Sequence, residues 1–158
     1  FELTDRPALV LLTRQGLPVF DRNTYPSTEE VYKGGYIMID CDSDPDLVII
    51  ATGSELWVAL EAMELLKDVQ VRVVNLVCWE IFDEQSEDYR QNVLGPPSAL
   101  RVSLEAGITQ GWEHYTGLNG LNLGINTFGM SAPGDKVASH FGITPEAVAE
   151  CIRQRLNL

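Results

Sequence analysis

Arg14 is the charged residue whose position most clearly suggests chemistry. It directly follows residues 8–13, a continuous apolar run of strand length. An arginine at the carboxyl end of a buried parallel strand is well placed to bind a phosphate or carboxylate through two parallel N–H donors. A salt bridge to one of the many acidic residues explains its position equally well, so both interpretations stay open.

A second candidate is the segment made of Thr52, Gly53 and Ser54, which lies between an apolar run and a helical pattern. Free N–H groups and the helix dipole at such a junction favour an anion or a nucleotide. Glu55 already supplies negative charge there. A capped helix that follows a glycine turn is therefore the simpler interpretation.

Glu105 follows the apolar run 100–104 and should lie at the same edge of the sheet. A carboxylate at the end of a strand can act as an acid, a base or a hydrogen-bond acceptor. We favour a structural role, in which Glu105 pairs with Arg101 or with a backbone amide. The functional alternative is a regulatory anion site formed by Glu105 and the segment 52–54.

Other motifs that indicate catalysis are absent from the sequence. It contains no Walker loop, no GxGxxG, no HExxH and no GxSxG. The two histidines, His114 and His140, fall in different helical segments, so a two-histidine metal site is unsupported. We therefore predict no catalytic and no metal-binding residue in this chain.

Two segments, residues 78–82 and 111–117, are rich in aromatic side chains. Trp112 and Tyr115 have helical spacing, which is found more often in a core or an interface than in a platform for stacking a ligand. We expect both segments to pack inside the protein or against a partner.

Apolar runs of strand length alternate with helical patterns along most of the chain. The predicted strands are residues 35–40, 47–51, 69–77, 100–104 and 123–127. The predicted helices begin after Ser54, cover residues 86–93 and close the chain over residues 144–156. The expected N-caps are Ser54, Ser86 and Thr144.

This alternation indicates βαβ units and a mainly parallel sheet with helices on both faces. Residues 35–40 and 47–51 are joined by a turn too short for a parallel crossover, so we expect that pair to be antiparallel. The predicted fold class is α/β: a three-layer domain with a five-stranded mixed, mainly parallel sheet that has one antiparallel strand.

The beginning of the chain does not fit this alternation. Residues 8–13 predict a lone strand, and a strand needs a sheet. Residues 18–30 are polar, contain Pro18 and Pro26, and lack periodicity, which is typical of a linker. We expect the first strand to belong to a preceding domain that is missing here.

Charge and composition exclude several classes of protein. The 158 residues carry 11 Lys+Arg and 23 Asp+Glu, a net charge of −12 at pH 7, which disfavours nucleic acid and membrane surfaces as partners. No apolar run approaches the roughly 18 residues of a membrane-spanning helix, and residues 1–6 lack the basic region of a signal peptide.

The three cysteines, Cys41, Cys78 and Cys151, contain no CxxC pair and form a poor disulfide framework. We expect reduced thiols, with Cys78 and Cys151 packed as small apolar groups. A cytoplasmic protein is the resulting prediction.

Many short motifs occur in the order in which the transketolase family has them. They include LTRQGLP (12–18), KGGY (33–36), IATGSE (50–55), VRVVN (71–75), CWEIF (78–82) and SAP (131–133). Each motif alone is weak, but together they cover nearly the whole chain, with the linker matching least. The sequence resembles the C-terminal domain of transketolase, preceded by the last strand of the pyrimidine-binding domain.

The resemblance implies three parts: residues 1–17 as the terminal strand of a preceding domain, 18–33 as a linker, and 34–158 as a transketolase C-terminal domain. It implies a complete enzyme of the pentose phosphate pathway that transfers a two-carbon ketol unit from phosphorylated ketoses to aldoses. Arg14 matches the family arginine that binds the phosphate of the substrate.

The same resemblance implies thiamine diphosphate and a divalent cation, Mg²⁺ or Ca²⁺, bound between the first two domains of a homodimer. The expected partners are therefore the remaining transketolase domains, a second subunit and sugar phosphates. No cofactor is expected in this chain, which by itself should be inactive and have a structural, dimer-supporting or regulatory role.

Three alternatives remain. The chain could be a stand-alone α/β module that binds an anionic regulator or nucleotide, or a scaffold domain without a ligand. It could also be the C-terminal part of another thiamine-diphosphate enzyme, such as the β subunit of a 2-oxo acid dehydrogenase. The IATGSE and CWE runs favour transketolase.

Overall fold

A single sheet forms the centre of the computed structural model, which describes residues 6–158. Its strands are β1 (Gly35–Ile39), β2 (Leu47–Ala51), β3 (Val71–Leu76), β4 (Leu100–Leu104) and β5 (Leu121–Leu123). They lie in the order β1-β3-β2-β4-β5. Strands β2 to β5 are parallel and β1 is antiparallel to β3, which confirms the mixed, mainly parallel sheet.

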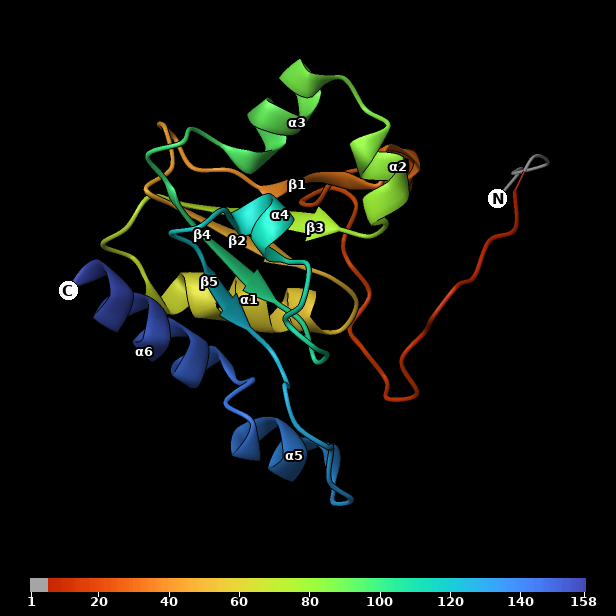
Figure 1. Cartoon of the computed structure of the whole chain (residues 1–158), viewed down its shortest axis with the longest axis vertical. Helices are drawn as coiled ribbons and strands as arrows, with labels where there is room; N and C mark the ends of the chain where they lie inside the picture. The colour runs from red at the N-terminus through yellow and green to blue at the C-terminus, as the bar shows by residue number, and fades with distance from the viewer. Residues whose placement is uncertain (1–5) are drawn as a thin grey trace.

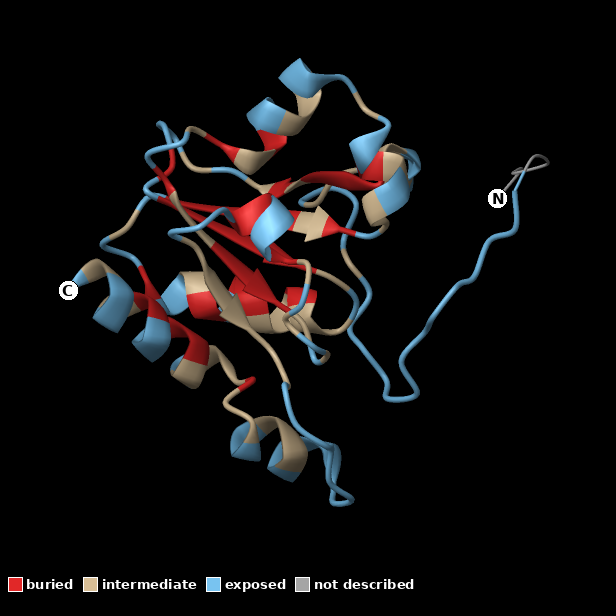
Figure 2. Cartoon of the chain, in the orientation of Figure 1, coloured by how far each residue is buried: buried red, intermediate tan, exposed pale blue. Residues whose placement is uncertain are grey.

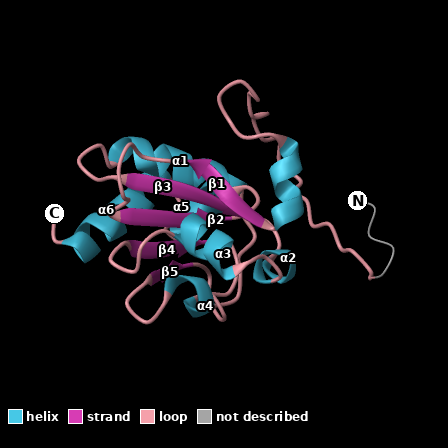
Figure 3. Ribbon diagram, turned by 90° about the horizontal axis from the view of Figure 1, so that it is seen from above, coloured by secondary structure: helices cyan, strands magenta, loops and turns pink. Residues whose placement is uncertain are grey.

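Helices cover both faces of this sheet (Figures 1 and 3). One face carries α1 (Glu55–Leu65) and α6 (Pro145–Leu156), and the other carries α2 (Trp79–Asp83), α3 (Glu87–Leu94) and α4 (Glu113–Thr116). A short 3₁₀ helix, η1 (Thr28–Lys33), precedes β1, and α5 (Gly134–His140) precedes α6. The predicted three layers are therefore present.

Strand β2 lies at the centre of the fold and is buried at every position. Alternate side chains of β2 enter two separate apolar cores: Leu47, Ile49 and Ala51 face α1 and α6, whereas Val48 and Ile50 face the other helices. Figure 2 shows the buried sheet between helices whose outer faces are exposed. An apolar strand without alternation requires such cover on both faces.

The predicted neighbour of β1 is wrong. Strand β1 pairs with β3, not with β2, whose two edges are taken by the parallel strands β3 and β4. The turn after β1 crosses the amino end of β3, where the backbone N–H groups of Asp46 and Leu47 donate to Gln70 O. A short turn thus joins two strands that are antiparallel but not adjacent.

The predicted strand 123–127 is wrong except at Leu123, because β5 covers Leu121–Leu123. Among the described strands β5 pairs with β4, which ends at Leu104, so the residues after Leu123 have no strand to pair with. They bond instead to the loop that follows β4, where Ile125 N donates to Gly107 O at 2.7 Å.

The predicted strand at residues 8–13 is not formed in this structure. Residues 6–27 contain no strand, and residues 6–19 are exposed throughout, in an arm that Figures 1 and 2 show leaving the domain. Leu9, Leu11 and Leu12 are each 84% exposed. A strand requires a hydrogen-bonded neighbour, and none of the described strands lies beside this arm. Residues 1–5 of the predicted terminal segment, 1–17, lie outside the described residues.

The segment expected to be a linker, residues 18–33, is partly packed onto the domain. Phe20 stacks on Trp57 of α1 with ring centroids 4.3 Å apart, and Tyr25 contacts Phe20 edge-on at 4.9 Å. Ser27 Oγ accepts a hydrogen bond from Glu29 N and begins η1. The aromatic contacts fix where the arm leaves the domain.

Candidate functional site

The predicted anion-binding segments do meet at one edge of the sheet. Ala51 at the end of β2 pairs with Leu104 at the end of β4, so the segment 52–54 and Glu105 follow neighbouring strands at the same edge. Asn75 of β3 pairs with Ala51 from the other side. The carboxyl edge of the parallel strands is therefore the candidate site that the sequence indicates.

The beginning of α1 differs from the expected capped helix. Ser54 occupies the N-cap position with helical dihedral angles, φ −66° and ψ −30°, and makes no capping bond. Its hydroxyl donates instead to Glu55 Oε1 at 2.8 Å. A side-chain cap needs the extended backbone conformation, so Ser54 lies at the predicted position before α1 but does not cap the helix. Gly53 has φ +58°, a left-handed conformation that glycine adopts at little cost.

Glu105 acts as a structural acceptor, although not for the predicted partner. Its Oε2 accepts a hydrogen bond from the indole Nε1 of Trp112 at 2.8 Å. Arg101 is separated from it by nearly the whole length of β4, about 13 Å at the rise of a strand, and donates to three backbone carbonyls instead. Glu105 thus ties the loop after β4 to the core.

The aromatic residues form a core, as predicted. Trp112, Tyr115 and Phe82 are at most 1% exposed. Trp79 meets Trp112 and Tyr115 edge-on, with ring centroids 4.9 and 5.0 Å apart. Gly111 has φ +94°, and a Cβ atom there would stand 3.0 Å from the Trp79 ring, so glycine is required at this turn.

Tyr115 is also the most strongly perturbed acid of this region. Its hydroxyl lies 3.3 Å from both carboxylate oxygens of Asp83 and donates to them. Burial, followed by the negative charge of Asp83, raises the pKa of Tyr115 well above its usual value. The phenol is therefore a permanent hydrogen-bond donor at neutral pH, and a structural one.

The two histidines lie on separate helices, as predicted. His114 of α4 is exposed, with Nε2 3.6 Å from Asp83 Oδ1, and His140 lies on α5. Between residues 6 and 158, no group of three or more His, Cys, Asp or Glu side chains could hold a metal ion. The described residues thus offer no metal centre.

The cysteines match their prediction only in part. All three are free thiols, but Cys151 is exposed rather than buried because α6 turns Val148, Ala149 and Ile152 toward the core. Cys78 is half-buried, with Sγ 3.3 Å from Glu80 Oε2. A backbone N–H and this thiol lower the pKa of Glu80 below its usual value.

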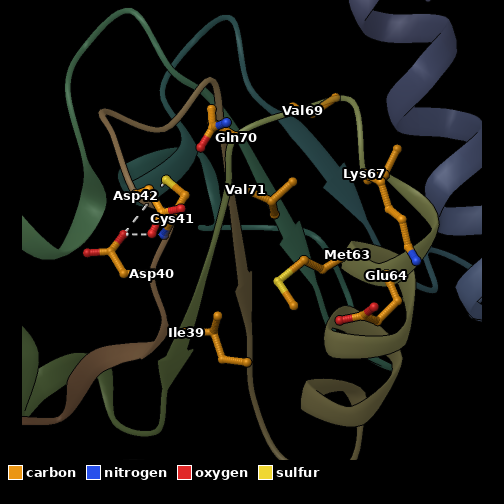
Figure 4. A pocket seen from close by; sticks show the side chains of 11 residues that line it. Ile39, Asp40, Cys41, Asp42, Met63, Glu64, Lys67, Val69, Gln70 and Val71 are labelled. Atoms are coloured by element: carbon orange, nitrogen blue, oxygen red, sulfur yellow. Dashed lines mark hydrogen bonds between the residues drawn. The ribbon is translucent and has the colours of Figure 1, made fainter.

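Two of the cavities lined by described residues lie at the amino edge of the parallel strands. The smaller, about 280 Å³, lies between the segment 39–42 and α1. Figure 4 shows Asp40, Cys41 and Asp42 on one side of it and Met63, Glu64 and Lys67 on the other.

The larger cavity, about 1040 Å³, is a groove beside the ends of α3 and α6. Neither cavity is lined by Glu105 or by the segment 52–54. The anion site at the carboxyl edge therefore remains a prediction. The larger groove contains Arg72 and Arg101, which our sequence interpretation did not select as site residues. The sequence signal for both residues was a charged side chain at the second position of a strand that is mostly apolar.

Arg14 lies in the exposed arm, where the part of the chain that the structure describes gives it no hydrogen bond or ion pair. No described acidic side chain forms the salt bridge that was its structural alternative. Its guanidinium is thus available to a ligand or to another part of the protein.

Two nucleophilic side chains of the described residues bond to neighbouring carboxylates, the Ser54 hydroxyl to Glu55 and the Cys78 thiol to Glu80. At the carboxyl edge, the polar side chains hold their own loops, as in the bonds from Ser54 to Glu55 and from Trp112 to Glu105.

Comparisons with known proteins give a consistent result. The family model described as "Transketolase-like TK C-terminal domain" matches residues 34–144. A transketolase of Aquifex aeolicus is 46% identical over 151 residues, which cover 94% of this chain and 22% of that protein.

Solved structures agree in fold. A transketolase from Leishmania mexicana superposes with a TM-score of 0.76 at 40% identity, covering 83% of this chain and 19% of that one. A transketolase variant from Pichia stipitis gives a TM-score of 0.82 at 35% identity, covering 91% and 20%. This chain spans about a fifth of the length of these proteins.

Proposed function

This chain belongs to the family of transketolase-like C-terminal domains, and we propose that it works as the C-terminal part of an enzyme that transfers two-carbon ketol units. The donors would be phosphorylated ketoses and the acceptors aldoses, in the pentose phosphate pathway. The observation that carries the proposal is the 46% identity to a transketolase over 94% of the chain.

The architecture of the domain favours a structural role within such an enzyme. The edge loops are tied to the domain's own core, and the aromatic side chains that could stack a ligand are buried among themselves. We propose that the domain stabilises the assembled enzyme and is inactive by itself.

The exposed arm supports the proposed division of the chain. Residues 1–17 would complete the sheet of a preceding domain, residues 18–33 would connect the two domains, and residues 34–158 would form the C-terminal domain. The apolar side chains of Leu9, Leu11 and Leu12 face solvent in the described part of this segment. A strand that is apolar on both faces is stable only inside a covered sheet.

The cofactors would be thiamine diphosphate and a divalent cation, Mg²⁺ or Ca²⁺. The residues of this chain do not fit the cation, since residues 6–158 contain no cluster of metal-binding side chains. As the family resemblance implies, we assign the cation and thiamine diphosphate to the preceding domains of a complete transketolase.

Arg14 is the residue that we assign to the substrate, as the cation that binds its phosphate group. A guanidinium can donate two parallel hydrogen bonds to a phosphate. In the described residues this side chain has no other partner that would compete.

A homodimer in the cytoplasm is the remaining part of the proposal. The three free thiols support a reducing compartment. Among the described residues, no helix combines the length and the apolar character that crossing a membrane requires.

Two measurements test this function. Immunoblotting of source-cell extract with an antibody against this chain should detect a polypeptide about four to five times heavier than 17.5 kDa. That polypeptide, once purified, should transfer ketol units only when thiamine diphosphate and a divalent cation are added.

The isolated 158-residue chain is the matched control and should show no turnover with the same additions. Turnover by the isolated chain would refute the supporting role. A lone band at 17.5 kDa would refute the single-polypeptide arrangement.

A further inference from the structure

The groove of about 1040 Å³ lies at the edge of the sheet opposite to the predicted anion site. It is bordered by the loop before β2, the loop between α3 and β4, the turn after α4, and the end of α6. In Figure 1 these segments gather on the side where the chain ends, away from the exposed arm. Nothing in the proposed function uses this groove.

Two arginines enter the groove from the same row of the sheet. Val48 of β2 pairs with Arg72 of β3 on one side and with Arg101 of β4 on the other. Residues paired across parallel strands lie on the same face, and strands two apart are separated by about 10 Å. The two guanidinium groups therefore approach one region from both sides.

Both arginines also hold the carboxyl end of α3. Arg101 donates from Nε to Leu94 O and from Nη2 to Gly95 O, each at 2.9 Å, while Arg72 Nη1 donates to Asn92 O. Cations at this end of a helix complement its dipole. Only part of their donor capacity is used, because each terminal nitrogen of Arg101 carries two N–H bonds and makes one hydrogen bond.

The charge of the two arginines is balanced differently. Arg72 is 9% exposed and forms an ion pair with Asp40, with Nε and Oδ1 2.8 Å apart. Arg101 has no carboxylate within 4 Å among residues 6–158. Burial lowers the pKa of Arg101, yet a guanidinium remains charged at neutral pH. A partly buried cation without a counter-charge favours an anion in the adjoining groove.

Other charged side chains in the groove modulate this preference. Arg155 of α6 lines it and donates to Asn119 O at 2.9 Å. Asp44 and Asp46, in the loop before β2, also line it and oppose an anion. Three cations and two carboxylates line the groove, and Asp40, outside the lining, neutralises Arg72. The groove is therefore close to neutral within a chain of net charge −12, and Arg101 is its partly buried cation without an ion-pair partner among the described residues.

We propose that this groove binds a phosphate group, held by the unused N–H donors of Arg101 with Arg72 and Arg155 as flanking cations. The ligand is free phosphate or a small phosphate monoester, because two guanidinium groups fit the oxygen geometry of either. This site is separate from the substrate site assigned to Arg14 and does not depend on the proposed function.

Inorganic phosphate is titrated into the ¹⁵N-labelled chain at pH 7.5, with sodium chloride keeping the ionic strength constant. We expect saturable shifts of the amides of Gly95, Gly117 and Gly120, which line the groove. The amide of Gly53, at the opposite edge, should not move. Methyl phosphate, titrated in parallel, should saturate the same amides if the ligand is a monoester and fail to do so if it is free phosphate. Absence of saturable shifts with inorganic phosphate overturns the proposal.

Two arginines of α6 provide a matched pair of variants. Arg155 and Arg153 each donate from Nη2 to a backbone carbonyl of another segment, but only Arg155 lines the groove. Arg155→Gln should weaken phosphate binding about two- to fivefold, as expected for an exposed cation. Arg153→Gln changes the net charge equally and should leave the affinity unchanged. Equal weakening by both variants overturns the proposal.

Substitutions inside the groove complete the test. Arg101→Gln should weaken binding about tenfold or more, provided that thermal unfolding shows a folded variant. Asp44→Asn should strengthen binding about twofold, whereas Asp135→Asn on α5, outside the groove, should not. If Arg101→Gln fails to fold, the phosphate affinities of the two matched pairs of variants decide whether the groove binds phosphate. These pairs are Asp44→Asn with Asp135→Asn, and Arg155→Gln with Arg153→Gln. An unchanged affinity in a folded Arg101→Gln variant overturns the proposal.

Discussion

Two side chains at the carboxyl edge of the sheet, which were candidates for catalysis or ligand binding, form structural hydrogen bonds instead. Glu105 had the type and position of a catalytic acid, yet it accepts the indole N–H of Trp112. Ser54 was expected to cap α1, yet its hydroxyl bonds to Glu55. In both cases a residue close in space completes the hydrogen bond, because a buried polar group without a partner is costly.

Arg14 carries the clearest functional prediction at the residue scale. In the complete enzyme, Arg14→Ala should raise KM for phosphorylated donors about tenfold or more, because a charge-assisted hydrogen bond to phosphate is lost. Steady-state kinetics with phosphorylated and unphosphorylated donors measures this. Arg22→Ala is the control, since Arg22 is exposed in the same segment but bonds to Pro26 O. An unchanged KM removes Arg14 from the substrate site.

Tyr115 predicts a pH dependence of stability. The raised pKa means that the folded state holds the phenolic proton more tightly than the unfolded chain. Its contribution is therefore complete below the unfolded pKa of about 10 and is lost as the pH rises above it. Tyr115→Phe should lose less stability than the wild type between pH 9 and pH 11, as measured by urea unfolding.

Tyr32→Phe is the control for that comparison, because Tyr32 is 66% exposed. Tyr32→Phe should lose as much stability as the wild type between pH 9 and pH 11. The same alkaline loss in Tyr115→Phe would show that the Asp83 contact does not govern this transition.

At the scale of elements, the helices differ in whether a side chain caps their first turn. Thr144 Oγ1 accepts from Ala147 N at 3.3 Å and caps α6, as predicted, and Pro145 occupies the first turn. Ser86 caps α3 in the same way, through Tyr89 N. The Ser54 hydroxyl makes no such bond.

Thr144→Ala should therefore lower the free energy of unfolding by about 1 kcal/mol, and the melting temperature by about 2–4 °C. Ser54→Ala removes a hydroxyl from the same helix position. It should lower the free energy of unfolding by less than about half of that amount, because no capping bond is lost. Thermal unfolding of both variants checks this. Equal losses would contradict the difference in capping.

At the scale of the whole molecule, the arm is exposed whereas the domain has a buried core. Residues 8–16 are exposed throughout, whereas Phe20 is half-buried against Trp57. The arm touches the domain through Arg6, which bonds to Glu84 at 2.5 Å, and such exposed ion pairs contribute little.

Limited digestion with trypsin should therefore cut after Arg14 before it cuts after Arg72 or Arg101, which lie in the sheet. The remaining fragment should keep its melting temperature within about 2 °C, since little buried surface is removed. Mass spectrometry and calorimetry of the digest measure both. Early cleavage in the sheet, or a large drop in melting temperature, would contradict this division.

The sequence alone determined the elements that depend on local pattern. The bounds of β2 and β4 were predicted to the residue, because their apolar runs are uninterrupted and bounded by turns. The Thr144 and Ser86 caps and the aromatic core around Trp112 followed from short-range spacing as well. So did the meeting of the segment 52–54 and Glu105 at one edge, because parallel strands share the direction of their carboxyl ends.

Only the tertiary structure decided the contacts between segments far apart in the chain. The pairing of β1 with β3, the partner of Glu105, and the row formed by Arg72, Val48 and Arg101 all depend on strand order. Strand order follows from which faces and edges are buried together, and this is a property of the whole fold. A charge or a hydroxyl therefore shows its chemical type in the sequence, but its partner becomes known only when the chain is packed.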